Sequence, residues 1–205
     1  MSSPSETSVS ALVARIRNGD AATVGRLMDR FRGYLKLLAE VQLDRKLRAK
    51  VDPSDVVQHT YLEAFRDFGQ FRGGTEGEFA AWLRQILSRN LAGEVRRYRG
   101  TQRRDVQLER SLNHELDASS LALDRGLAKP GTSPSQQAMH RENAVVLADA
   151  LMQLPEDYRH VILLRHIKGK TFPEVAAEMG RTQDSVRHLW TRAIARLRTH
   201  MGADR

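Results

Sequence analysis

Side chains that can contact a charged polymer are concentrated near the carboxyl end of the chain, on one side of a helical pattern. These residues are Thr182, Ser185, Arg187, His188, Thr191, Arg192 and Arg196. Arginine, histidine and hydroxyl side chains can bond both phosphate oxygens and the edges of base pairs. The pattern therefore predicts a surface that reads double-stranded DNA.

Such a surface needs a rigid support, and the preceding residues predict one. Thr171 and Glu174 have the spacing of a capping box, which satisfies free backbone groups at the start of a helix. Gly180 follows where the chain must turn with positive φ, and Thr182 can cap the next helix. Trp190 lies on the apolar side of that helix, which favours a core role over base stacking. Two helices joined by so short a turn form a helix-turn-helix, whose second helix enters the major groove.

A second group of candidate residues lies in the amino-terminal half of the chain. Phe71 is the only large apolar residue of the glycine-rich stretch 69–77, which predicts a loop. The helix expected from 78 to about 98 ends in a basic cluster of Arg96, Arg97 and Arg99. An aromatic beside a loop and a basic stripe can bind unstacked bases and phosphates. The basic cluster also has a simpler interpretation, a favourable interaction with the helix dipole.

Composition agrees with a nucleic-acid partner. The 205 residues carry a formal charge of +8, and a 40% hydrophobic content is sufficient for real cores. The absence of cysteine excludes disulfides and thiolate metal sites. No apolar run approaches the roughly 20 residues of a membrane helix, and no signal peptide is visible, so a cytoplasmic protein is expected. No catalytic constellation or phosphate loop stands out, so neither an enzyme nor a cofactor is expected.

Apolar spacing of three and four predicts an all-α protein of two small helical domains joined by a flexible linker. The expected boundaries are 10–99 for the first domain, 100–137 for the linker and 138–202 for the helix-turn-helix domain. The linker contains proline and glycine breakers and room for one transient helix. In the first domain we expect one long amphipathic helix from Val24 to Val41. A further helix is expected from Ser54 to Phe68, with Phe65 on its buried side.

Two sets of residues resemble the bacterial extracytoplasmic-function (ECF) sigma factors. Similar to their domain two are the run 52–58 (DPSDVVQ), Phe65, Phe71-Arg72-Gly73, Phe79, Trp82-Leu83, Asn90 and Arg97. Similar to their domain four are Leu154-Pro155, Tyr158-Arg159, Glu174-Val175-Ala176, Gly180, Ser185-Val186-Arg187, Arg192-Ala193 and Leu197-Arg198. The two sets cover most of the chain outside the linker and the termini.

The resemblance implies a subunit that binds core RNA polymerase and directs promoter-specific initiation. It assigns contacts with the polymerase β′ clamp helices to Asp55, Gln58, His59 and Leu62. It assigns −10 recognition and melting to Phe71, Arg72, Asn90, Arg96, Arg97 and Arg99. The helix from Thr182 would read the −35 element, and the first helices of domain four would meet the β flap. An anti-sigma protein is a further implied partner.

Two other functions remain open at this point. The helix-turn-helix could serve a DNA-binding regulator that does not dock on polymerase. Alternatively, Asp52, Asp55, His59 and Glu63 lie near one helical face and could hold a metal, as in a nuclease. No second helix offers matching ligands, and charges on a helix face are usually only solvated. No metal is therefore expected.

Overall fold

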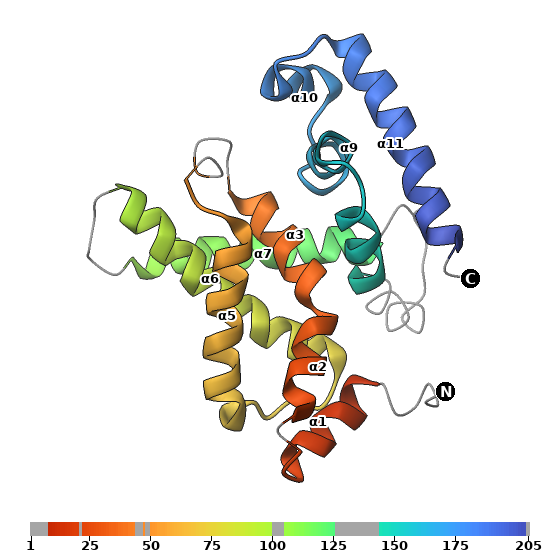
Figure 1. Cartoon of the computed structure of the whole chain (residues 1–205). Helices are drawn as coiled ribbons and strands as arrows, with labels where there is room; N and C mark the ends of the chain where they lie inside the picture. The colour runs from red at the N-terminus through yellow and green to blue at the C-terminus, as the bar shows by residue number, and fades with distance from the viewer. Residues whose placement is uncertain are drawn as a thin grey trace. The chain divides into compact units, whose positions relative to one another are not determined.

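The computed structural model describes residues 8–20, 22–43, 47, 50–99, 105–125 and 144–203. Every regular element in these ranges is a helix, and they contain no strand, as the sequence predicts (Figure 1). The chain forms two compact units, Met1–Ala118 and Ser119–Arg205. The prediction of an all-α protein with two helical parts is confirmed.

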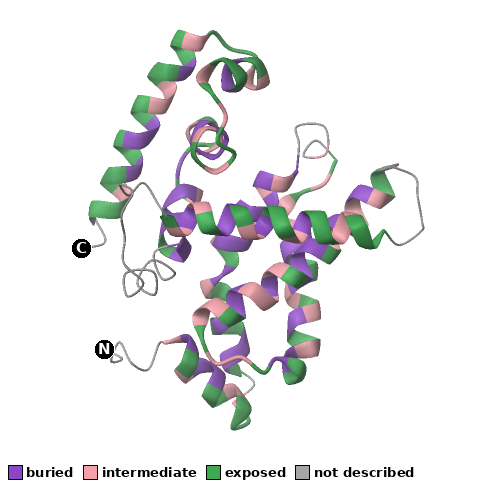
Figure 2. Ribbon diagram, turned by 180° about the vertical axis from the view of Figure 1, so that it is seen from behind, coloured by how far each residue is buried: buried purple, intermediate pink, exposed green. Residues whose placement is uncertain are grey.

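The first unit is built around the pairing of two helices, α5 and α6, with α3 packed against both. Its elements are α1 (Val9–Arg17), α2 (Ala22–Arg30), α3 (Arg32–Gln42), α5 (Pro53–Asp67), the 3-10 helix η1 (Phe68–Gln70), α6 (Glu76–Arg99) and the start of α7 (Val106–Arg125). Buried positions recur along one side of each helix in Figure 2, because each helix has one apolar stripe facing the core. Phe31, Tyr34 and Phe79 are among its largest fully buried side chains.

The prediction of one long helix from Val24 to Val41 is wrong, because the chain breaks at Phe31 into α2 and α3. Phe31 has φ −99° and ψ 2°, outside the helical range. Its N–H bonds to the carbonyl of Met28, three residues back, at 3.0 Å. The fully buried Phe31 ring packs edge-on against Phe79, 5.2 Å between centroids. The apolar spacing continues through the break, so periodicity alone could not reveal it.

The range expected as a linker contains a substantial helix. α7 has 20 residues, and two ion pairs join it to α6. Arg96 bonds Glu109 at 3.2 Å, and Arg84 bonds both Asp117 and the Tyr34 hydroxyl at 2.8 Å. Ion pairs with a neighbouring helix give α7 stability that an isolated transient helix lacks. The breakers predicted at 130–134 lie outside the described residues.

The second unit ends in the predicted helix-turn-helix. Helical residues 144–152 are followed by α9 (Glu156–Ile162), the π-helix η2 (Leu163–Ile167), α10 (Phe172–Met179) and α11 (Gln183–Ala203). The Thr171 N–H donates to Glu174 Oε2 at 2.7 Å, as a capping box requires. Gly180 takes φ 63°, and the Thr182 hydroxyl accepts from the Ser185 N–H at 3.3 Å. These local predictions are confirmed.

Candidate nucleic-acid interface

One face of α11 presents the predicted DNA-reading residues to solvent. The buried stripe of Val186, Ala193 and Leu197 turns the opposite face outward. The exposed residues there are Thr182, Ser185, Arg187, His188, Thr191, Arg192 and Arg196. A hollow of about 340 Å³ is lined by Arg181, Ser185, His188, Leu189 and Arg192. The structure thus gathers the predicted set on one accessible surface.

No described carboxylate neutralises the guanidinium groups on this face. Among the described residues, no carboxylate lies within ion-pair distance of Arg187, Arg192 or Arg196. Arg181, just before α11, is instead paired with Asp157. Unpaired cations on an exposed helix attract DNA phosphates and can displace their counterions. The α11 face therefore has the charge and the donors that duplex DNA requires.

Trp190 supports this face from behind. Its indole Nε1 donates to His166 Nε2 at 2.9 Å, and the two rings stack 5.8 Å apart. Burial, with a smaller contribution from the Arg165 charge, lowers the pKa of His166. A neutral imidazole keeps Nε2 available as the acceptor. Trp190 is thus held by side chains of its own unit, in agreement with a core role.

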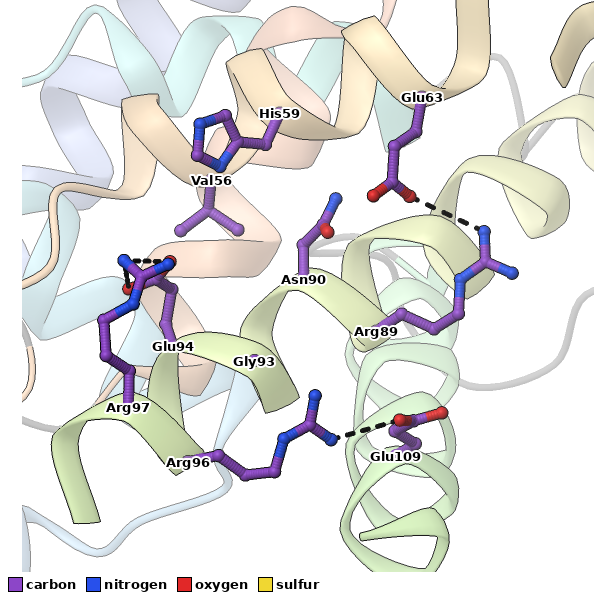
Figure 3. Close-up of a pocket in the computed structure, with 10 residues that line it drawn as sticks. All are labelled: Val56, His59, Glu63, Arg89, Asn90, Gly93, Glu94, Arg96, Arg97 and Glu109. Carbon is purple, nitrogen blue, oxygen red and sulfur yellow. Dashed lines mark hydrogen bonds and ion pairs between the residues drawn. The ribbon is translucent and has the colours of Figure 1, made fainter. Parts of the chain in front are cut away.

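A second candidate surface is a hollow of about 500 Å³ between α5 and α6 (Figure 3). It is lined by Val56, His59, Glu63, Arg89, Asn90, Gly93, Glu94, Arg96, Arg97 and Glu109. Asn90, Arg96 and Arg97, all predicted to contact the −10 element, are brought together here. His59, predicted to contact polymerase, lies on the same hollow. Arg99 is the last residue of α6, and the Arg99 side chain lies outside the part of the chain that the structure describes.

In contrast to α11, the arginines of this hollow are matched by carboxylates. Arg96 pairs with Glu109 of α7 at 3.2 Å, and these side chains are only 20% and 13% exposed. Arg97 pairs with Glu94 at 3.0 Å. Arg89 lies 3.7 Å from Glu63. Polyanionic DNA would have to replace the partner of the part-buried Arg96, whereas the Arg97 side chain is 75% exposed and can be reached beside its partner.

Asn90 is held in place from α5. Its amide nitrogen donates to Glu63 Oε1 at 3.3 Å, and its amide oxygen accepts from the Thr60 backbone N–H at 3.3 Å. The Thr60 hydroxyl is itself buried and bonded to the Val56 carbonyl at 2.8 Å. An amide fixed by two neighbours has a defined orientation, which base recognition needs.

The structure does not place Phe71 beside Asn90. The Phe71 side chain is 6% exposed, with ring centroids 5.3 Å from Phe79 and 5.2 Å from Trp82. A Cβ atom on Gly73 would lie 2.6 Å from the Phe71 ring, so this loop position requires glycine. Arg72, the next predicted residue, is exposed. Phe71 therefore anchors the loop, and Arg72 is the loop residue available for contact.

Arg17 of α1 fixes the same loop from outside. Its guanidinium donates to the carbonyls of Phe71 and Gly73 at 3.2 and 2.8 Å. Sequence reasoning missed this residue, because a bond across 54 positions leaves no local signal.

Comparison with known proteins identifies the second unit directly. A family model described as "Sigma-70, region 4" matches residues 144–197, which include α9, α10 and most of α11. The ECF RNA polymerase sigma-E factor of Haemophilus influenzae is 26% identical over 171 residues, 82% of each chain. The RNA polymerase sigma-H factor of Pseudomonas aeruginosa is 28% identical over 169 residues, covering 82% of this chain and 80% of that one. The chain belongs to the ECF-type RNA polymerase sigma factors.

The outward face of α5 is the remaining predicted surface of this sigma factor. Asp55, Gln58, His59 and Leu62 are all exposed, as predicted. Phe65 was expected in the core and this is wrong: 59% of it is exposed, beside Leu62 at 69%. The buried stripe of α5 passes through Ala64 instead. Sequence reasoning missed the exposure of Phe65, although its spacing of three from Leu62 was visible.

Two further findings bear on the other functions. No group of three or more histidine, aspartate or glutamate side chains suited to a metal occurs among the described residues of the sigma factor. Within the same ranges, no helix is long and apolar enough to cross a membrane.

Proposed function

We propose that this sigma factor binds core RNA polymerase and directs it to promoters through two separate DNA contacts. Domain two, at 10–99, engages the −10 element, and domain four, at 138–202, reads the −35 element. The observation that carries the proposal is the α11 face of the helix-turn-helix, where exposed guanidinium groups have no described carboxylate within ion-pair distance. The protein acts in the cytoplasm, and its role is binding without catalysis.

The −35 contact uses α11 and the preceding Thr182, with the helix in the major groove. Arg187, His188 and Arg192 supply donors for base edges, while Thr182, Ser185 and Arg196 are placed for phosphates. Thr191 already donates its hydroxyl to the Arg187 carbonyl at 3.0 Å, so it offers only an acceptor. The hollow around Ser185 and His188 gives room for a base-pair edge.

The −10 contact uses the hollow between α5 and α6. Its volume, about 500 Å³, lies in the range of pockets that bind small organic molecules, and an unstacked base is of that size. Asn90 offers a fixed amide for the base, and Arg96 and Arg97 can hold the adjoining phosphates. Arg72 is an exposed cation of the loop, whereas Phe71 keeps the loop in shape from inside. Arg99, the last residue of α6, is a further proposed −10 contact.

The polymerase contact is the exposed face of α5. Leu62 and Phe65 form an apolar pair one helical turn apart, with Asp55, Gln58 and His59 next to it. Exposed apolar side chains rimmed by polar groups are typical of protein interfaces. The β′ clamp helices are the proposed partner, and the β flap would receive the first helices of the second unit. We also propose a cognate anti-sigma protein that competes for these surfaces.

Run-off transcription with purified core polymerase tests the proposal. Genomic fragments of the host serve as templates, and core enzyme without the sigma factor is the control. We expect discrete products that require the sigma factor, and their absence on every template would refute it. DNA binding that persists while tagged protein recovers no β or β′ subunit would indicate the regulator instead. The same recovery from the host would reveal an anti-sigma protein.

A further inference from the structure

Three side chains pack around the aromatic ring of Phe172 in the helix-turn-helix unit. Phe172 is the first residue of α10 and is half-buried. The Trp190 ring packs against it edge-on, 5.8 Å between centroids. The guanidinium carbons of Arg165 and Arg187 lie 5.0 and 5.5 Å from the centroid of the Phe172 ring. Both distances fall within the range of cation–π attraction.

Other contacts keep this ring in place. Trp190 is itself fixed by its hydrogen bond to His166 and by stacking on that imidazole. Arg165 donates to the Lys170 carbonyl at 3.1 Å, which ties its guanidinium to the turn before α10. These contacts restrain the Phe172 ring. A side chain that packs on the ring is therefore restrained as well.

Arg187 is the member of this group that points to solvent. It lies on the α11 face that the proposed function assigns to DNA, and no described carboxylate is within ion-pair distance of it. An arginine side chain has many rotamers in solution, and a DNA contact must otherwise remove that freedom. Contact with the ring restrains the side chain before DNA arrives.

We propose that Phe172 is a positioning residue that holds the Arg187 guanidinium ready for the major groove. This inference rests on the proposed reading of duplex DNA by α11. A ring face attracts the charge of the guanidinium without accepting its hydrogen bonds, so all five N–H donors stay available. A carboxylate partner would occupy two of them and would repel DNA phosphates. An aromatic support therefore suits a DNA-reading arginine better than an ion pair does.

The first test needs no DNA and is made on the full chain. The ring current of Phe172 should move the NMR signal of the Arg187 side-chain Nε–H upfield of that of Arg198, an exposed arginine on the same helix. Phe172→Leu should abolish the displacement, and Phe172→Tyr should keep it. An Arg187 signal like that of Arg198 in the unmodified protein would overturn the proposal, whatever α11 binds.

The second test measures affinity for a duplex that the full chain selects from a random pool. Phe172→Leu should weaken binding by about 2-fold to 5-fold, the range of an exposed cation–π contact. Phe172→Tyr should bind normally. Met179→Ala, which trims another half-buried residue of α10, is the control for a general loss of packing and should also bind normally.

A double substitution then decides whether Phe172 acts through Arg187. Once Arg187→Ala is present, Phe172→Leu should cause no further loss of affinity. An equal loss in both backgrounds, or tighter binding by Phe172→Leu, would contradict the positioning role. Failure of the unmodified chain to select any duplex would instead count against the proposed reading by α11, and the NMR result would still decide the role of Phe172.

Discussion

The two surfaces of this sigma factor that we propose to contact DNA differ in whether their arginines are paired with carboxylates. On α11, Arg187, Arg192 and Arg196 have no carboxylate partner among the described residues. At the end of α6, Arg96 and Arg97 are each bonded to a glutamate. The α11 face can meet duplex DNA as it is, whereas the part-buried Arg96 at the α6 end must first exchange its internal partner for a phosphate. We infer that the upstream contact of α11 forms readily. The downstream contact then follows, because a bound α11 tethers the α6 end to the same DNA and raises its effective concentration there.

Removal of a base-reading arginine from α11 should have the largest effect. Arg192→Ala should cost about 1 to 3 kcal/mol of binding free energy if Arg192 makes a bidentate contact with a base, with relaxed specificity at one −35 position. A phosphate contact would instead give uniform weakening and a shallower dependence on salt. Binding to a set of single-base promoter variants separates the two results. Arg198→Ala, on the same helix, is the matched control.

The exposed pair on α5 should matter for polymerase and not for DNA. Phe65→Ser should weaken binding to core polymerase by at least about 5-fold, because truncating an interface aromatic commonly costs more than ~1 kcal/mol. The side chain is mostly exposed, so the free energy of unfolding should change little. Leu121→Ser, at another exposed leucine, provides the control. Unchanged binding to core polymerase would remove Phe65 from the docking face.

Removal of the carboxylate that pairs with Arg96 should leave an arginine at the α6 end available to DNA, as the arginines of α11 are. Glu109→Gln should strengthen binding of single-stranded −10 DNA by about 3-fold and should steepen its salt dependence by about one phosphate contact. Glu115→Gln is the control. It makes the same charge change on α7 at an exposed residue whose side chain is hydrogen-bonded to Ser111. It should have a smaller effect on both quantities. Weaker binding by Glu109→Gln would show that Glu109 positions Arg96 for DNA.

The support behind α11 should contribute a pH effect on stability between pH 7 and 5, and it should be the smallest of the effects predicted here. The folded-state pKa of His166 is lowered, mainly by burial, while an unfolded histidine titrates near about 6.5. The unfolded state therefore takes up the proton first as pH falls, so the stability contributed by His166 is present above about pH 6.5 and is lost below it. Urea unfolding at several pH values should show this loss. In His166→Gln, the free energy of unfolding should no longer show the part of its change between pH 7 and 5 that His166 causes.

The parts of the fold that depend on residues close together in the sequence could be predicted. The capping box at Thr171 and Glu174 and the turn at Gly180 involve groups within a few positions of each other, and all were found. The break at Phe31 was missed, because packing of its ring against Phe79 leaves the apolar spacing unchanged.

The candidate site shows the same division. Periodicity was enough to place the exposed residues of α11, whose opposite side is a clear apolar stripe. It could not show that Phe71 turns inward and Phe65 outward, since both are large apolar residues at the edge of a pattern. Nor could it show that Glu109, in the expected linker, pairs with Arg96. Contacts between distant parts of the chain decide all three.

The division of labour between the two surfaces is tested most directly by measuring occupancy and strand opening on the same promoter. Nuclease footprinting of the polymerase holoenzyme reports occupancy upstream, and permanganate reactivity of unpaired thymines reports opening. Arg192→Ala should lower occupancy and leave the opened fraction of bound complexes unchanged. Asn90→Ala should keep the upstream footprint and lower that fraction. If both variants lost occupancy and opening in the same proportion, the two surfaces would not have separate roles.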